Sequence, residues 1–286
     1  MKLKLQTYIP ADNRLVAYEN EINVLKAVNL FGHLRRSELA AAVWPRSPAQ
    51  SGLRMCGRTL KRLIAEGDLV EKPNSLGSFS VVLAPKGARR LNLLGIDADD
   101  GRRLSSVDGA QFFHRTLGTR YLIEKVSGTN QVYGEFAFIK GRAPVSRARL
   151  SESFHKYPDG LIIYPGEERN YTSVVTAADW VEVEFNIKND EDYGKLLKVA
   201  MQVGSYLDAS ETCILDRMVF VFDIRQQHQA ALLSYLKRKV LPTMDDHVLQ
   251  VLHSIVFAKV KVKLPLVWEQ LEEITAAEAL GLESIM

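Results

Sequence analysis

The chain has few cysteines and no long hydrophobic run. Its two cysteines, Cys56 and Cys213, lie far apart in the 286 residues and suggest neither a disulfide framework nor a zinc cluster. No segment approaches the roughly eighteen uncharged apolar residues of a membrane-spanning helix. The first residues, Met1–Leu5, are followed by polar residues and lack the apolar region of a signal peptide. We therefore expect a protein of the reducing cytoplasm with no membrane partner.

The chain also lacks internal repeats and low-complexity runs. Its length exceeds the usual size of one domain, which predicts two. The hydrophobic fraction of 47% and the charged fraction of 25% are typical of a globular protein with buried cores. Glycine, aspartate and serine are concentrated near residue 100, as in an exposed connection. We expect a first domain over residues 1–95, a linker over 96–109 and a second domain over 110–286.

Positive charge is concentrated in the first domain. Residues 1–90 contain 15 Lys and Arg against 7 Asp and Glu, whereas the remainder contains 22 against 27. A basic module suits a phosphate-rich partner, because neutralising phosphates releases condensed counterions. The first domain is therefore predicted to bind nucleic acid. The acids of the remainder are either ordinary surface residues or metal ligands, and charge alone does not separate these two interpretations.

Three helical segments precede a hairpin in the first domain. Hydrophobic spacing predicts helices over residues 19–31, 38–43 and 49–66. Strands are predicted over residues 68–72 and 78–83, joined by a turn that contains glycine. This order resembles the winged helix-turn-helix, in which the third helix enters the major groove of DNA.

The third helix has an apolar side and a basic side. Its inward stripe recurs at i, i+3, i+7 and i+10 and comprises Leu53, Cys56, Leu60 and Leu63. The predicted DNA contacts are the cations off this stripe and one hairpin lysine: Arg54, Arg58, Lys61, Arg62 and Lys72. The other interpretation is that these cations only solubilise a helix of a protein–protein adaptor. The basic balance of the segment favours DNA.

The second domain alternates helices and strands. Its predicted helices cover residues 111–125, 191–207, 227–239 and 245–256. Its predicted strands cover residues 131–139, 160–164, 180–187, 217–222 and 258–264. The core order α-β-β-β-α-β is that of a mixed α/β domain. The whole chain is therefore expected to be an α+β protein of two domains.

Three carboxylates of this domain suggest a metal site. Asp159 stands at the start of strand 160–164, while Glu182 and Glu184 project from one face of strand 180–187 because strand side chains alternate. Two carboxylates on one strand face repel each other unless a cation lies between them or both are solvated. Apolar neighbours favour a buried strand, where acids need partners. We expect these three to bind Mg²⁺ or Mn²⁺, with a solvated glutamate pair as the alternative.

The same residues carry a resemblance to a known fold. Pro158-Asp159, the pair Glu182-x-Glu184 and the core order resemble the PD-(D/E)xK nuclease fold over about residues 110–265. The resemblance implies that the aspartate and the acidic strand residue bind the metal, and that a lysine assists the chemistry. It also implies hydrolysis of a phosphodiester bond.

The lysine of this motif is replaced in the sequence. Its usual position holds Glu184, as in some restriction endonucleases of the fold. The resemblance then implies a lysine from the next helix, where Lys195 and Lys198 lie. Lys188 is a weaker candidate for the same metal centre, because four residues along a strand span about 13 Å.

A second resemblance covers the whole chain. A winged helix joined to a nuclease-like domain with a Pro-Asp-Gly motif and an acidic strand is similar to the replication-relaxation family, which includes relaxases of mobilisable plasmids. Members tend to carry a histidine in the helix that opens the second domain, and His114 fits this position. His114 is either a catalytic residue or a structural or phosphate-contacting one. The histidine cluster of HUH relaxases is absent from the sequence.

Three functions remain open at this point. The leading hypothesis is a metal-dependent DNA nickase or relaxase that acts at an origin of a plasmid or mobile element. Its partners would be double-stranded DNA, a second copy of the chain or other conjugation proteins. The second hypothesis is a non-catalytic regulator of replication or transcription with an inactive nuclease-like domain, which the glutamate at position 184 supports. The third is a restriction-type endonuclease that cuts both strands at many short sites.

Overall fold

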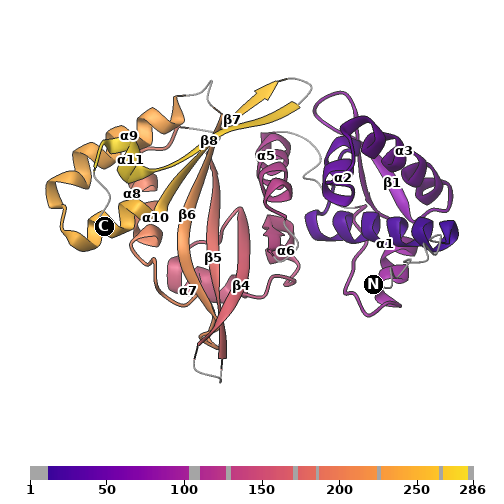
Figure 1. The fold of residues 1–286 in the computed structure, drawn as a ribbon, viewed down its shortest axis with the longest axis horizontal. Coiled ribbons are helices and arrows are strands. Elements are labelled where there is room, and N and C mark those ends of the chain that lie inside the picture. The colour runs from indigo at the N-terminus through magenta and orange to yellow at the C-terminus, as the bar shows by residue number, and fades with distance from the viewer. Residues whose placement is uncertain are drawn as a thin grey trace, which may run out of the picture. The chain divides into compact units, whose positions relative to one another are not determined.

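The computed structural model describes residues 12–102, 110–126, 130–169, 173–184, 187–223, 227–263 and 267–282 (Figure 1). The fold mixes helices and strands, and the chain divides into two compact units. The first unit is Met1–Lys72 with Phe79–Leu104, and the second is Pro73–Ser78 with Ser105–Met286. Among the described residues, no helix is long and apolar enough to cross a membrane.

Three helices form the core of the first unit: α1 (Asn13–Phe31), α2 (Arg36–Val43) and α3 (Ala49–Ala65). Helix α1 begins six residues before its predicted start, because the Asp12 side chain caps it by accepting from a backbone N–H at 2.9 Å. Gly32 ends α1 with a positive φ of 81°. The predicted apolar stripe of α3 is buried except at Leu53, which is half-buried.

A two-stranded sheet follows these helices, formed by β1 (Leu69–Pro73) and β2 (Phe79–Leu83). The Asn74 side chain shapes the turn between the strands, since its Oδ1 accepts from two backbone N–H groups further along the turn. An isolated bridge pairs Leu34 with Val81 and so attaches the hairpin to the segment between α1 and α2. The hairpin is thereby fixed to the helical core by backbone hydrogen bonds.

Helix α4 (Pro85–Asn92) completes the described elements of the first unit. The segment that follows was expected to be an exposed linker, but its first part is held against this unit. Ala98 is buried, and its backbone N–H and C=O pair with the Asn92 side chain at 3.0 and 2.9 Å. The remainder of the expected linker, residues 103–109, lies outside the described residues.

The described part of the second unit contains a six-stranded sheet in the order β3-β4-β5-β6-β7-β8. Its strands are β3 (Gln131–Gly134), β4 (Gly160–Arg169), β5 (Ser173–Glu184), β6 (Cys213–Asp223), β7 (Ile255–Lys263) and β8 (Val267–Thr275). Neighbours β3, β4 and β5 are antiparallel, β6 and β7 run parallel to β5, and β8 is antiparallel to β7. The carboxyl ends of β5, β6 and β7 therefore meet at one edge of the sheet.

Helices cover both faces of this sheet (Figure 1). They are α5 (Ala110–Lys125), α6 (Glu135–Ile139), α7 (Arg147–Phe154), α8 (Asp190–Ala200), α9 (His228–Lys239), α10 (Asp246–Ser254) and α11 (Ala276–Leu280). Helix α5 packs so closely on β5 that a Cβ at Gly118 would lie 3.1 Å from the Val183 side chain. Trp180 projects from the opposite face of β5 into a core that includes Tyr193 of α8 and Leu232 of α9. Alternate residues of β5 thus face different helical layers.

Two predicted elements end at least five residues earlier than expected. The predicted strand over residues 131–139 stops at Gly134 and continues as α6. In α6 the adjacent residues Ala137 and Phe138 are both buried. A helix can bury two adjacent side chains on one face, whereas a half-exposed strand places them on opposite faces. The predicted helix over residues 191–207 ends at Ala200 and passes into turns. The elements α7, β8 and α11 were not predicted.

Candidate functional site

Asp159 lies directly before β4 and beside β5. The antiparallel register pairs Gly160 with Val181, and the Val183 backbone N–H donates to Asp159 Oδ2 at 2.9 Å. Glycine at position 160 allows the chain to pass close to α5, because a Cβ there would lie 2.8 Å from Leu122 Cδ1. The Pro-Asp-Gly turn is therefore held by packing on one side and by a backbone hydrogen bond on the other.

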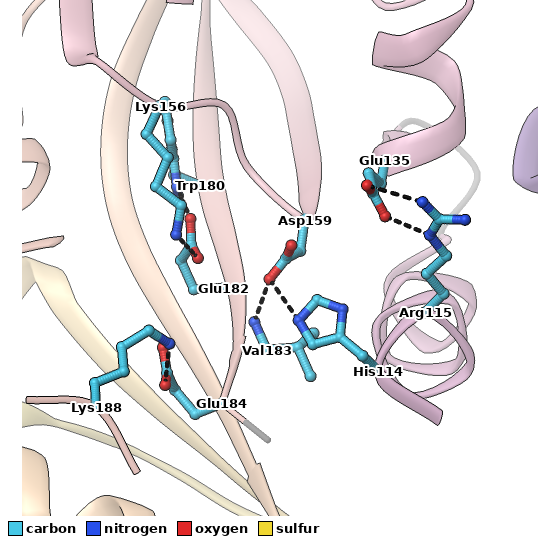
Figure 2. Close-up of polar contacts among 10 residues, drawn as sticks. All are labelled: His114, Arg115, Glu135, Lys156, Asp159, Trp180, Glu182, Val183, Glu184 and Lys188. Carbon is cyan, nitrogen blue, oxygen red and sulfur yellow. Dashed lines mark hydrogen bonds and ion pairs between the residues drawn. The ribbon is translucent and has the colours of Figure 1, made fainter. Parts of the chain in front are cut away.

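His114 of α5 contacts this carboxylate, with its Nε2 3.2 Å from Asp159 Oδ2 (Figure 2). Burial would lower the pKa of His114, but the hydrogen bond to Asp159 and the nearby negative charges outweigh it and raise the pKa. Burial would raise the pKa of Asp159, but the hydrogen bond and charge of His114 lower it. Both shifts favour an imidazolium–carboxylate pair. The structure thus brings together two residues that the sequence predicted separately.

Glu182 is fully buried in β5 and has two side-chain partners. It forms an ion pair with Lys156, and its Oε1 accepts from Trp180 Nε1 at 2.6 Å. Burial raises the pKa of Glu182 to about 7, against the opposing effect of Lys156 and with the negative charge of Asp159 adding to the rise. Glu182 therefore exchanges its proton near neutral pH, where a cation can compete for the carboxylate.

Glu184 ends β5 and is also fully buried. Its Oε2 forms an ion pair with Lys188, while its Oε1 has no hydrogen-bond partner among the described residues. Burial raises the pKa of Glu184, and the charge of Lys188 opposes the shift. A buried carboxylate oxygen without a donor is costly, so this atom is a natural position for a further cation or donor.

The contact between Lys188 and Glu184 corrects the separation of about 13 Å that strand spacing predicted for these two residues. That estimate assumed a strand continuing to residue 187, but β5 ends at Glu184 and Ile187 lies outside any strand. Asn189 then caps α8 by accepting from a backbone N–H at 2.9 Å. Lys188 therefore lies directly before the cap of α8 rather than in a strand, and its Nζ contacts the carboxylate four residues earlier.

The three carboxylates lie close to the ends of the same two strands but on different sides of β5. Glu182 and Glu184 project from one face with their lysines, whereas Asp159 points toward His114 and α5 (Figure 2). Among the described residues, no three histidine, cysteine, aspartate or glutamate side chains already form a group that could hold a metal ion. The metal ligands predicted from the sequence therefore stay a prediction.

The lysines predicted from α8 lie apart from these carboxylates. Lys195 is exposed and pairs with Glu191 at 2.8 Å, and Lys198 is exposed in the last turn of the helix. The lysines that contact the buried glutamates are Lys156 and Lys188 instead. Lys156 was missed, although a cation three residues before Asp159 in a segment leading into a buried strand is a signal that could have found it.

The predicted DNA-contacting residues of the first unit lie on α3 and β1. Arg54, Arg58 and Lys61 are exposed and recur at i, i+4 and i+7, so they share one face of α3. Arg62 is also exposed but forms an ion pair with Glu21, with 3.1 Å between Nε and Oε1. Lys72 is half-buried on β1. The structure therefore presents the first three cations as a group and gives Arg62 a partner within the unit.

Comparison with known proteins adds no family to this geometry. No protein-family model, curated protein or solved structure matches the chain. The replication-relaxation and PD-(D/E)xK resemblances therefore depend on the motif residues and on the order of the elements alone.

Proposed function

We propose that this protein binds DNA through α3 of a winged helix-turn-helix and cleaves one DNA strand with the second unit. The observation that carries the proposal is a set of ionisable side chains at the adjacent ends of β4 and β5, of which the two glutamates are buried and the others half-buried. The set, called here the carboxylate cluster, comprises Asp159, Glu182, Glu184, His114, Lys156 and Lys188. The pKa is shifted in the three carboxyl groups, in His114 and in Lys156, and such a concentration of shifted groups is typical of a functional site.

The donor chemistry of the cluster fits a hard divalent cation. Carboxylate oxygens are the ligands that Mg²⁺ and Mn²⁺ prefer, and Glu184 Oε1 is buried with no partner among the described residues. An ion held by Asp159, Glu182 and Glu184 would polarise the scissile phosphate and lower the pKa of a water nucleophile. At Glu182 such a cation would compete with a proton, because the pKa is raised to about 7, and with Lys156, while Trp180 Nε1 donates to Oε1.

The surrounding residues have separate roles in this proposal. His114 keeps Asp159 ionised and oriented through their hydrogen bond. Lys156 and Lys188 neutralise the glutamates when no cation is present. With a phosphate in the cluster, the same ammonium groups would stabilise the negative charge that develops on its oxygens. Within the part of the chain that the structure describes, Lys195 pairs with Glu191 and Asp192, and neither it nor Lys198 forms an ion pair with the cluster.

In this proposal the first unit selects the DNA site. Its helices and hairpin follow the winged helix-turn-helix order, and the exposed cations of α3 face solvent, where a DNA groove can reach them. A single selected site suits the nick at a plasmid or mobile-element origin that the family resemblance implies. The proposed substrate is therefore double-stranded DNA with one cleaved strand.

A second function is favoured by the ion pairs themselves. Lys156 and Lys188 already neutralise Glu182 and Glu184, and a buried acid that has a stable ion-pair partner needs no metal. A non-catalytic DNA-binding regulator would use the same contacts only to stabilise the second unit. The two functions differ in whether the protein cleaves the DNA that it binds.

Conversion of supercoiled plasmid to open circles tests the proposed function. The substrate carries the DNA that flanks the gene for this protein, and a plasmid without that DNA is the control. We expect open circles with Mg²⁺ or Mn²⁺ and none with EDTA. Linear product on both plasmids would indicate a restriction-type endonuclease. Unchanged supercoiled DNA with both ions would overturn the nickase in favour of the regulator.

A further inference from the structure

We propose that a basic segment of the second unit, Lys140 to Arg149, binds the sugar–phosphate backbone of DNA next to the carboxylate cluster. The inference deepens the proposed function and rests on it, because it assumes that DNA reaches this unit. It adds a second DNA contact, separate from α3, that would hold the strand to be cut.

Charge is the first observation. Residues 136–151 contain no aspartate or glutamate, and their four cations are Lys140, Arg142, Arg147 and Arg149. Lys140, Arg147 and Arg149 are exposed and Arg142 is half-buried. Within the described residues, the guanidinium groups of Arg147 and Arg149 form no ion pair with an acid. Two exposed arginines without an acidic partner, in a stretch of sequence that contains no acid, fit a polyanion.

Position is the second observation. The antiparallel register pairs Gly134 of β3 with Gly160 of β4, so α6 begins at the level of Asp159. Glu135, the first residue of α6, forms a bidentate ion pair with Arg115, the residue after His114 (Figure 2). The basic segment therefore starts one short helix away from the pair that His114 and Asp159 form.

Three cation–aromatic contacts, on two rings, link the segment to the same part of the second unit. The Phe136 ring lies under two of its cations, with Lys140 Nζ 5.8 Å and the Arg142 guanidinium 6.0 Å from the ring centroid. The Arg147 guanidinium lies 4.2 Å from the ring centroid of Tyr157, two residues before Asp159. Cations held over aromatic rings are already partly ordered, so they lose less freedom when they bind a phosphate.

The chemistry of these cations favours a phosphate backbone over an acidic protein. Arginine presents a planar fork of donors that matches two phosphate oxygens at once, and three of the four cations are arginines. The phosphates of a DNA strand that is cleaved at the carboxylate cluster must also lie close to this segment. If removing the charges of this segment left DNA binding unchanged, an acidic protein partner would be indicated instead.

Salt dependence of DNA binding tests the inference. Full-length protein is titrated in EDTA, where the proposed cleavage cannot occur, against a fluorescent duplex and the corresponding single strand at several KCl concentrations. The test variant is Arg147→Gln with Arg149→Gln. Losing two phosphate contacts should reduce the slope of log K against log salt by about 1.8 for the duplex or about 1.4 for the single strand. The DNA form whose salt slope changes, duplex or single strand, is the form that the segment binds.

Matched variants separate this contact from loss of charge or fold. Lys237→Gln with Lys239→Gln removes two exposed cations from α9 and should leave the slope unchanged. Arg147→Lys with Arg149→Lys retains the charges and should retain the parent slope. Parent-like slopes for the glutamine variant on both DNA forms would overturn the inference, as would an equal loss in the α9 variant. Because no cleavage is measured, a protein that never nicks DNA can still pass this test, so the two proposals fail separately.

Discussion

Replacing Glu182 with glutamine is expected to lower metal-dependent nicking at least about 100-fold, equivalent to roughly 2.7 kcal/mol in the activation free energy. Glutamine has nearly the same shape and still accepts from Trp180 Nε1, which lies 2.6 Å from Glu182 Oε1. It carries no charge, so it cannot neutralise a divalent cation. The measurement is the initial rate of open-circle formation with Mg²⁺ or Mn²⁺, for the parent and the variant at saturating protein.

Glu191→Gln is the matched control for this variant. Glu191 lies in the same unit, but its side chain is 78% exposed on α8, where it pairs with Lys195. This control should nick at the parent rate, and both variants should bind DNA as the parent does. A Glu182→Gln protein that nicks as fast as the parent would show that the carboxylate cluster is not the site of cleavage.

Removing the exposed cations of α3 is expected to weaken DNA binding at least about 100-fold, while the second unit stays intact. The variant combines Arg54→Gln, Arg58→Gln and Lys61→Gln. Each lost phosphate contact should reduce the salt slope by about 1, and any lost base contact costs a further 1–3 kcal/mol or so. All three side chains are exposed on one helical face, so the change should leave the fold unaffected. Fluorescence anisotropy with the flanking DNA measures both quantities.

A second triple variant removes the same charge elsewhere in the first unit. Arg14→Gln, Lys26→Gln and Arg89→Gln alter exposed cations of α1 and α4. If α3 is the recognition helix, this variant should bind DNA at least about ten times more tightly than the α3 variant. Equal losses in the two variants would mean that net charge, rather than α3, governs binding.

The elements of the first unit could be predicted because local signals decide them. The apolar stripe of α3 and the glycines after α1 and α3 identify helices without knowledge of distant contacts. The start of α1 was placed too late, because Asp12 caps a first turn that is largely exposed and carries little hydrophobic signal. The order of helices and strands could thus be predicted, but the start of α1 could not.

The carboxylate cluster could be predicted only in part. Strand alternation correctly placed Glu182 and Glu184 on one face of β5, and the Pro-Asp-Gly motif correctly placed Asp159 at the start of β4. Their lysine partners depend on where β5 ends and on how the chain turns before β4. Neither feature is marked by a periodic pattern in the sequence. Strand spacing therefore wrongly placed Lys188 too far from Glu184 to contact it.

The strand predicted over residues 131–139 failed for a related reason. A short run of apolar residues is compatible with a strand or with a helix, and only the core that receives it decides. The apolar residues of α6 pack on the second unit, where Phe138 joins the core with Trp180. The same change from strand to helix places Glu135 beside Arg115, a contact that the sequence did not reveal.

Calorimetric titration with Mn²⁺ tests the central claim most directly, namely that the carboxylate cluster holds a divalent cation. The parent protein should bind Mn²⁺ at neutral pH, and Asp159→Ala should abolish that binding while His114 and both lysines remain. Binding should also weaken as the pH falls below about 7, because protonated Glu182 competes with the ion. No heat of binding to the parent, or undiminished binding to Asp159→Ala, would contradict the claim and leave the regulator as the function.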